Sequence, residues 1–154
     1  MSAKHTRTVL VDTNVALDLL LAREPSAGEA MHIFALAEAK EIKLLLSTDA
    51  ISTIFYVVSK NKNARTAREA ISKLLDYVTL AGMDEACVLQ ALTYDFTDIE
   101  EALVASVAVD ARAEAVVTRN VRDFKNCPLP VLTPAELLGI LAHASDFGAT
   151  GEQA

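Results

Sequence analysis

The segment TVLVDTN, residues 8–14, decides the fold class of this chain. Its first four residues, Thr8–Val11, form a strand-length run of apolar and β-branched side chains, and an acid, Asp12, follows directly. A similar arrangement recurs late in the chain, where the run Ala115–Val117 leads into TRNVRDF, residues 118–124. In an open α/β sheet, ligands bind beyond the carboxyl ends of the strands. The two segments therefore predict polar side chains gathered at one edge of a sheet.

Short apolar runs alternate with longer helical patterns along the rest of the chain. The strands are apolar on both faces and no hairpin turns separate them, which favours parallel strands covered by helices on both sides. The sequence predicts an α/β fold, a three-layer α/β/α sandwich with a central, mainly parallel sheet of four to five strands. Strands are expected at about residues 8–11, 42–46, 78–81, 115–117 and 130–132. Helices are expected at about residues 14–24, 27–40, 49–60, 64–77, 84–94, 98–112 and from 134 onward.

Three helix starts carry the Ser/Thr-x-x-Glu pattern of a capping box. The helix expected at 98–112 is apolar almost all round, which predicts that it is buried. The helix at 27–40 also has an apolar face, and any part of it left uncovered would suit a dimer surface. The three predicted boxes are Ser26 with Glu29, Thr97 with Glu100, and Thr133 with Glu136.

The length and composition fit one globular domain. The 154 residues are 52% hydrophobic and 23% charged, which allows a sizeable core. We predict one domain over residues 1–144 and a small, polar, flexible tail over residues 145–154.

Cys87 and Cys127 are the only cysteines, so a disulfide framework is not expected and the reducing cytoplasm is the simpler location. The apolar run before Asp12 is too short for a signal peptide or a membrane span.

The net charge of −7 argues against a broad basic surface that covers nucleic acid. A local basic rim that binds RNA remains open, because Arg119 and Arg122 lie within the second acid-bearing segment and Lys125 follows it. Residues 60–68 are also locally basic. They suit a solvated helix junction, or a contact with nucleic acid or an acidic partner.

Three carboxylates, Asp12, Glu101 and Asp123, are the main candidate site residues. Asp12 could instead only cap the helix that follows, and Asp123 could be a turn aspartate. If the three converge, their mutual repulsion makes a bound Mg²⁺ or Mn²⁺ the natural solution, since oxygen-only ligands suit hard cations rather than zinc. In that case Asp12 and Asp123 would be direct ligands, and Glu101 would bind the metal or hold a metal-bound water.

Such a metal can polarise a phosphodiester, lower the pKa of a bound water and stabilise the leaving oxygen. Thr13 and Asn120 could donate to a phosphate or orient Asp12. Asn14 completes the first acidic segment as a further supporting residue. Asp98 also carries a site-supporting role, although the helix dipole explains an acid at that position. Glu100 needs no role beyond its capping box.

Taken together, these motifs resemble the PIN-domain family of metal-dependent ribonucleases, which includes the VapC-like toxins of toxin–antitoxin pairs. The resemblance rests on three segments in the same order and spacing, and it covers residues 8–138. It implies an RNA substrate, a possible antitoxin protein as partner, and a homodimer. The three segments are VLVDTN at 9–14, DIEEAL at 98–103 and VTRNVRDF at 117–124.

The chain departs from the family pattern at two positions. Thr53 stands where the family usually has a glutamate, and Asp49 one turn earlier is a candidate substitute. Glu101 stands where aspartate is commoner, and its side chain is one methylene longer. The first hypothesis is therefore a PIN-like endoribonuclease. The alternatives are a PIN-like binding or assembly module that no longer cuts RNA, and an unrelated α/β domain that binds a small phosphorylated ligand.

Overall fold

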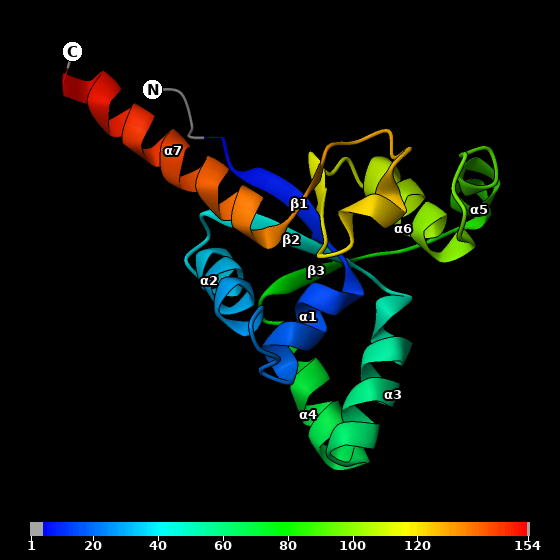
Figure 1. Cartoon of the computed structure of the whole chain (residues 1–154). Coiled ribbons are helices and arrows are strands. Elements are labelled where there is room, and N and C mark those ends of the chain that lie inside the picture. Colours follow the sequence, from blue (N-terminus) through cyan, green and yellow to red (C-terminus); the bar gives the residue numbers. More distant parts are fainter. Residues whose placement is uncertain (1–4, 154) are drawn as a thin grey trace.

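The computed structural model describes the backbone of residues 5–153 and the side chains up to residue 144. Five parallel strands form one sheet in the order β3-β2-β1-β4-β5 (Figure 1). The order places β1, the strand before Asp12, at the centre and pairs it with both β2 and β4. The strands are β1 (Arg7–Val11), β2 (Ile42–Ser47), β3 (Val78–Ala81), β4 (Ala115–Val117) and β5 (Val131–Leu132).

Helices cover both faces of this sheet, which confirms the predicted three-layer fold (Figure 1). All the predicted helices are present, and several end two or three residues earlier than expected. The helices are α1 (Thr13–Leu20), α2 (Ala27–Glu38), α3 (Ala50–Asn61), α4 (Ala64–Leu74), α5 (Glu85–Ala91), α6 (Ile99–Asp110), α7 (Pro134–Gln153) and the 3₁₀ turn η1 (Val121–Phe124).

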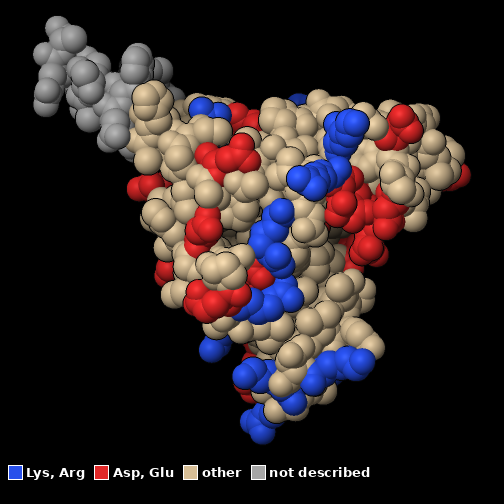
Figure 2. All heavy atoms as spheres, viewed as in Figure 1, with Lys and Arg blue, Asp and Glu red and all other residues tan. Residues whose placement is uncertain are grey.

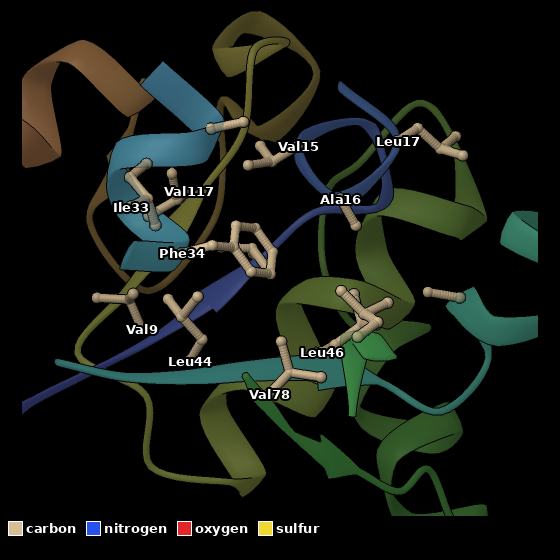
Figure 3. Close-up of a cluster of buried hydrophobic side chains, with 14 of the residues drawn as sticks. Val9, Val15, Ala16, Leu17, Ile33, Phe34, Leu44, Leu46, Val78 and Val117 are labelled. Atoms are coloured by element: carbon tan, nitrogen blue, oxygen red, sulfur yellow. The ribbon is translucent and has the colours of Figure 1, made fainter. Parts of the chain in front are cut away.

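The side chains of β1 alternate between two hydrophobic cores, one on each face of the sheet. Val9 and Val11 belong to the larger core, together with side chains of α1, α2 and α3. Figure 3 shows Val9 in this cluster with Val15 of α1 and Phe34 of α2. Leu10 points the opposite way, toward α6 and Phe124. Because successive strand residues face opposite sides, a strand covered on both faces must be apolar throughout, as β1 is. The central strand is thereby held rigidly, and the residue that follows it, Asp12, starts from a fixed point.

Two of the three predicted capping boxes are wrong. Ser26 has helical dihedral angles and its side chain makes no cap hydrogen bond, because the chain already turns there: the Ala27 amide donates to the Arg23 carbonyl at 2.8 Å. At α6 the cap is Asp98 rather than Thr97; Asp98 is extended and accepts from the Glu100 amide at 2.8 Å. The third box is confirmed, since Thr133 and Glu136 exchange two hydrogen bonds.

The prediction that α6 is buried all round holds for its middle and is wrong at its ends. Ile99 in the first turn is 51% exposed and Val109 near the end is 38% exposed, whereas Ala105 and Val107 are buried. Met31 on α2 is also exposed, at 59%.

Helix α7 continues to Gln153, so the segment predicted as a tail, residues 145–153, is helical, and its flexibility stays a prediction. Within the described residues, no helix is long and apolar enough to span a membrane.

Candidate functional site at the carboxyl edge of the sheet

The candidate site lies where β1 and β4 end side by side. The two strands are parallel, with Leu10 opposite Val116 and Val11 opposite Val117. The Asp12 amide donates to the Val117 carbonyl at 2.8 Å, so the pairing extends one residue past β1. Asp12 and Thr118 therefore leave the sheet at the same edge, as the sequence predicted.

Asp12 is partly buried, and both oxygens of its carboxylate accept hydrogen bonds. Its Oδ1 accepts from the Thr13 amide at 2.9 Å, which makes Asp12 the N-cap of α1. Its Oδ2 accepts from Thr118 Oγ1 at 2.8 Å and from Asn14 Nδ2 at 3.1 Å. Burial raises the pKa of Asp12, and the hydrogen bond from Thr118 opposes that rise. The carboxylate is thus both a helix cap and a desolvated negative charge.

Thr118 joins the residues around Asp12 into one network, a role that its place in the sequence did not reveal. It is fully buried, and its hydroxyl donates to Asp12. The same Oγ1 accepts from Asn14 Nδ2 at 3.3 Å and from the Asn120 amide at 3.1 Å. The support predicted for Thr13 therefore comes through its backbone amide. Asn120 reaches this network through its amide as well, and Asn14 orients Asp12 through its side chain.

Glu101 lies in the first turn of α6 and has a buried carboxylate oxygen, Oε2, without a hydrogen-bond partner. Burial is the main cause that raises the pKa of Glu101, and the negative charges of Asp98, Glu100 and Asp123 add to it. Asp123, in η1, also raises the pKa of Asp12. Asp123 is therefore close enough to repel both Asp12 and Glu101. An unpartnered buried carboxylate among other acids is the kind of site that a cation stabilises.

The three candidate acids line two adjoining hollows. One, of about 290 Å³, is lined by Asp12, Glu101 and Asn120 among others. The other, of about 370 Å³, is lined by Glu101, Asp123 and the basic side chains Arg122 and Lys125. Glu101 lines both. Within the described part of the chain, no three His, Cys, Asp or Glu side chains gather closely enough to hold one metal ion together, so the three-acid metal site stays a prediction.

Glu100 has a larger place in the site than the sequence suggested. Because Asp98 caps α6, the Glu100 side chain is not used in a capping box, and it lines the hollow beside Asp12. It also lines a smaller hollow with Asp49 and Thr53, next to Thr13. Thr53 and its candidate substitute Asp49 are therefore at the edge of the site. Asp98 lines the hollow that holds Asp123.

The raised pKa values of Asp12 and Glu101 predict that stability falls as the pH rises. The folded protein binds these protons more tightly than the unfolded chain does, so their stabilising contribution is complete below the unfolded pKa values, about 3.9 and 4.3. It is lost as the pH rises through the folded values. Urea unfolding from pH 4 to 8 measures this effect. The variant Asp12→Asn/Glu101→Gln should gain stability relative to the wild type with rising pH. If the free energies of unfolding of the two proteins change in parallel with pH, the pKa values of Asp12 and Glu101 are not raised.

The sequence profile of the PIN domain matches residues 8–122, which include Asp12, the whole of α6 with Glu101, and β4, and which end one residue before Asp123. The chain belongs to the PIN domain family. It is 26% identical over 136 residues to Ribonuclease VapC1 of Aquifex aeolicus, which covers 86% of this chain and 94% of that protein.

Solved structures share the PIN fold. VapBC2 from Rickettsia felis, bound to a DNA fragment from its promoter, superposes with a TM-score of 0.65 at 19% identity, covering 82% of this chain and 98% of that one. A toxin–antitoxin complex from Klebsiella pneumoniae has a TM-score of 0.62 at 25% identity, covering 82% and 97%. The predicted PIN-like fold is thus confirmed for nearly the whole chain.

The basic residues predicted beside this PIN site have different surroundings. Arg122 and Lys125 line the hollow with Asp123. Arg119 lines the hollow with Asp12, but its Nε is bound to Asp18 at 2.6 Å. Arg23, which the sequence did not single out, lines the same hollow. Figure 2 shows Lys and Arg side chains running beside a group of Asp and Glu on this face.

Proposed function

We propose that this PIN domain protein is a metal-dependent endoribonuclease of the toxin type, which hydrolyses RNA phosphodiester bonds. The observation that carries the proposal is the unpartnered, buried Oε2 of Glu101, on a wall shared by the hollows of Asp12 and Asp123. The similarity to Ribonuclease VapC1 supports the same activity.

The residues at the edge fit a hard divalent cation. The two hollows that Glu101 lines contain carboxylates and no histidine or cysteine, and oxygen ligands without histidine or thiolate favour Mg²⁺ or Mn²⁺. Asp12, Glu101 and Asp123 would hold the ion. When bound, such an ion supplies an activated water and stabilises negative charge on the phosphate.

The chain's own residues would then position the reacting groups. Thr118 and Asn14 hold the Asp12 carboxylate in one orientation through its Oδ2. Arg122 and Lys125 lie beside Asp123, where they can neutralise the phosphates of an RNA strand. In this arrangement the acids would face the scissile phosphate, and the basic side chains would hold the strand beside it.

The partners follow from the same proposal. The structural relatives named above include a VapBC protein and a toxin–antitoxin complex, which supports an antitoxin protein as partner. A homodimer is proposed as well, and the exposed Met31 on α2 is one apolar side chain that a second copy could cover. Action on RNA in the cytoplasm belongs to this proposal.

A PIN-like binding module that no longer cuts RNA is the second candidate. Two observations favour it. The position where the family usually has a glutamate holds Thr53, and no three acids gather around one point among the described residues. The two candidates differ in one property that can be measured directly, namely metal-dependent cleavage of RNA.

The first test is incubation of the pure protein with a long single-stranded RNA in Mn²⁺, in Mg²⁺ and in EDTA. The endoribonuclease predicts internal cuts in both metals and none in EDTA. Intact RNA under all three conditions, from folded protein, would instead support the binding module.

Metal binding can also be measured without RNA. We expect Mn²⁺ to raise the melting temperature of the wild type, because a ligand that binds only the folded state stabilises it. Glu101→Gln should abolish this shift, and it should also melt at a higher temperature than the wild type without metal, since it removes a desolvated charge. Glu69→Gln on α4, at an exposed carboxylate, is the matched control and should keep the full shift. An equal Mn²⁺ shift in Glu101→Gln would remove Glu101 from the metal site.

A further inference from the structure

Asp18 is the only charged side chain that is buried in the part of the chain the structure describes. It lies on α1, is 2% exposed, and both of its carboxylate oxygens are paired. Oδ1 accepts from Arg23 Nε at 3.0 Å, and Oδ2 accepts from Arg119 Nε at 2.6 Å. One buried acid thus holds two arginines, one from each of two separate segments.

The backbone fixes both arginines in place. After α1 the chain reverses through Ala22, which has a positive φ of 50°, and the Arg23 amide donates to the Asp18 carbonyl at 3.1 Å. This is the Schellman ending of a helix. On the other side, the Arg119 amide donates to Asn14 Oδ1 at 3.3 Å. Each arginine is therefore tied to α1 by its backbone as well as by its side chain.

The pairing through Nε leaves the outer ends of both guanidinium groups available. Among the described residues, neither terminal nitrogen of Arg119 has a hydrogen-bond partner, and Arg23 Nη2 has only a long contact, 3.4 Å, with the Asn14 carbonyl. The two side chains are 39% and 38% exposed. Both line the hollow of about 290 Å³ that Asp12 also lines.

The charge of this group is unbalanced. Two arginines and one aspartate leave one positive charge at the wall of the hollow, in a protein whose net charge is −7. The positive charge of Arg119 also reaches Asp12, since it lowers the pKa of that carboxyl. A purely structural ion pair would need one arginine. The second leaves a cationic fork beside the acids, and guanidinium forks match phosphate oxygens.

We propose that Arg23 and Arg119 form a phosphate-binding clamp and that Asp18 is its positioning residue. The ligand is a phosphodiester of single-stranded RNA that neighbours the bond placed at the acids. The identity of the ligand as RNA rests on the proposed function; the clamp itself rests on the two ion pairs.

The test measures binding of a single-stranded 2′-O-methyl oligonucleotide by fluorescence anisotropy in EDTA. The oligonucleotide carries the phosphates, and EDTA removes the metal that the proposed hydrolysis requires. Arg119→Gln and Arg23→Gln should each weaken binding about 10-fold, and each should lower the slope of log K against log salt by about 0.7, the value for one single-strand phosphate. Arg112→Gln, at an exposed arginine between the end of α6 and the start of β4, is the matched control and should bind as the wild type does. Unchanged affinity and slope in both clamp variants would overturn the proposal.

Asp18→Asn separates positioning from overall charge. The substitution makes the protein less negative by one charge, so charge alone predicts tighter binding of the oligonucleotide. The clamp predicts binding several-fold weaker, because an amide can accept from one guanidinium while its NH₂ group faces the other. Tighter binding from folded Asp18→Asn would overturn the positioning role.

If Asp18→Asn fails to fold, Arg119→Lys serves in its place. It keeps the charge without the fork, so the clamp predicts several-fold weaker binding, and wild-type affinity would overturn it. The RNA cleavage assay keeps the two proposals distinguishable. If the wild type binds RNA through the clamp but does not cut it, the nuclease proposal is refuted and the clamp proposal stands. If the wild type cuts RNA and the clamp variants bind it normally, only the clamp proposal is refuted.

Discussion

Replacing Asp12 by asparagine is expected to lower the rate of RNA cleavage about 1,000-fold or more, which corresponds to about 4 kcal/mol of activation free energy. Of the three candidate acids, Asp12 is the one held on both oxygens, by the Thr13 amide and by Thr118 and Asn14, at the end of the central strand. An amide keeps the shape and removes the charge that would hold the metal. Initial rates on a labelled RNA in Mn²⁺ measure the change.

The structure of Asp12→Asn should remain close to that of the wild type. The amide oxygen can still accept one set of the present hydrogen bonds, while the NH₂ group leaves the other donors without an acceptor at a cost of about 1–3 kcal/mol. Loss of the desolvated negative charge offsets part of that cost. Circular dichroism and a melting curve establish that the variant is folded. Glu69→Gln is again the control and should cut at the wild-type rate. Full metal-dependent cleavage by Asp12→Asn would refute the proposed site.

The fold and the edge of the site could be predicted because their signals are local in the sequence. A strand that is buried on both faces must be apolar throughout, and β1 and β4 are each followed at once by polar residues. Parallel neighbours end at the same edge, so two strand ends were enough to place Asp12 beside the segment that begins at Thr118. The same reasoning could not give distances between side chains, and the three-acid metal site therefore remains a prediction.

Other features depend on contacts that a sequence pattern does not contain. Asp18 reads as one polar residue on an apolar helix, yet one of its partners, Arg119, is 101 positions away. The capping box at Thr97 failed because the neighbouring residue, Asp98, adopts the extended conformation and caps α6 instead. That shift by one residue released Glu100 to line the site. Local patterns thus placed the elements, whereas side-chain roles at their ends depended on the tertiary structure.

Phe124→Ala is expected to lower the free energy of unfolding by about 3–5 kcal/mol. Phe124 is 1% exposed, lies in the smaller core with Leu10 and Val107, and meets the ring of Phe96 edge-on, with centroids 6.1 Å apart. Removing the ring leaves a cavity that the surrounding sheet and α6 cannot fill without moving. Since domains are typically stable by about 5–15 kcal/mol, this one change removes a large part of the total. Urea unfolding measures it.

The same ring anchors the turn that carries Asp123. Phe124 is the last residue of η1 and the only residue of that turn that is buried, so Asp123 keeps its place only while Phe124 stays in the core. We therefore expect a smaller Mn²⁺-induced rise in melting temperature for Phe124→Ala than for the wild type, provided that the variant is folded at the start of the melt. Phe124→Leu, which keeps an apolar side chain, should lose less stability and retain more of the metal response. A full metal shift in folded Phe124→Ala would mean that Asp123 is held without the ring, or that it does not contact the metal.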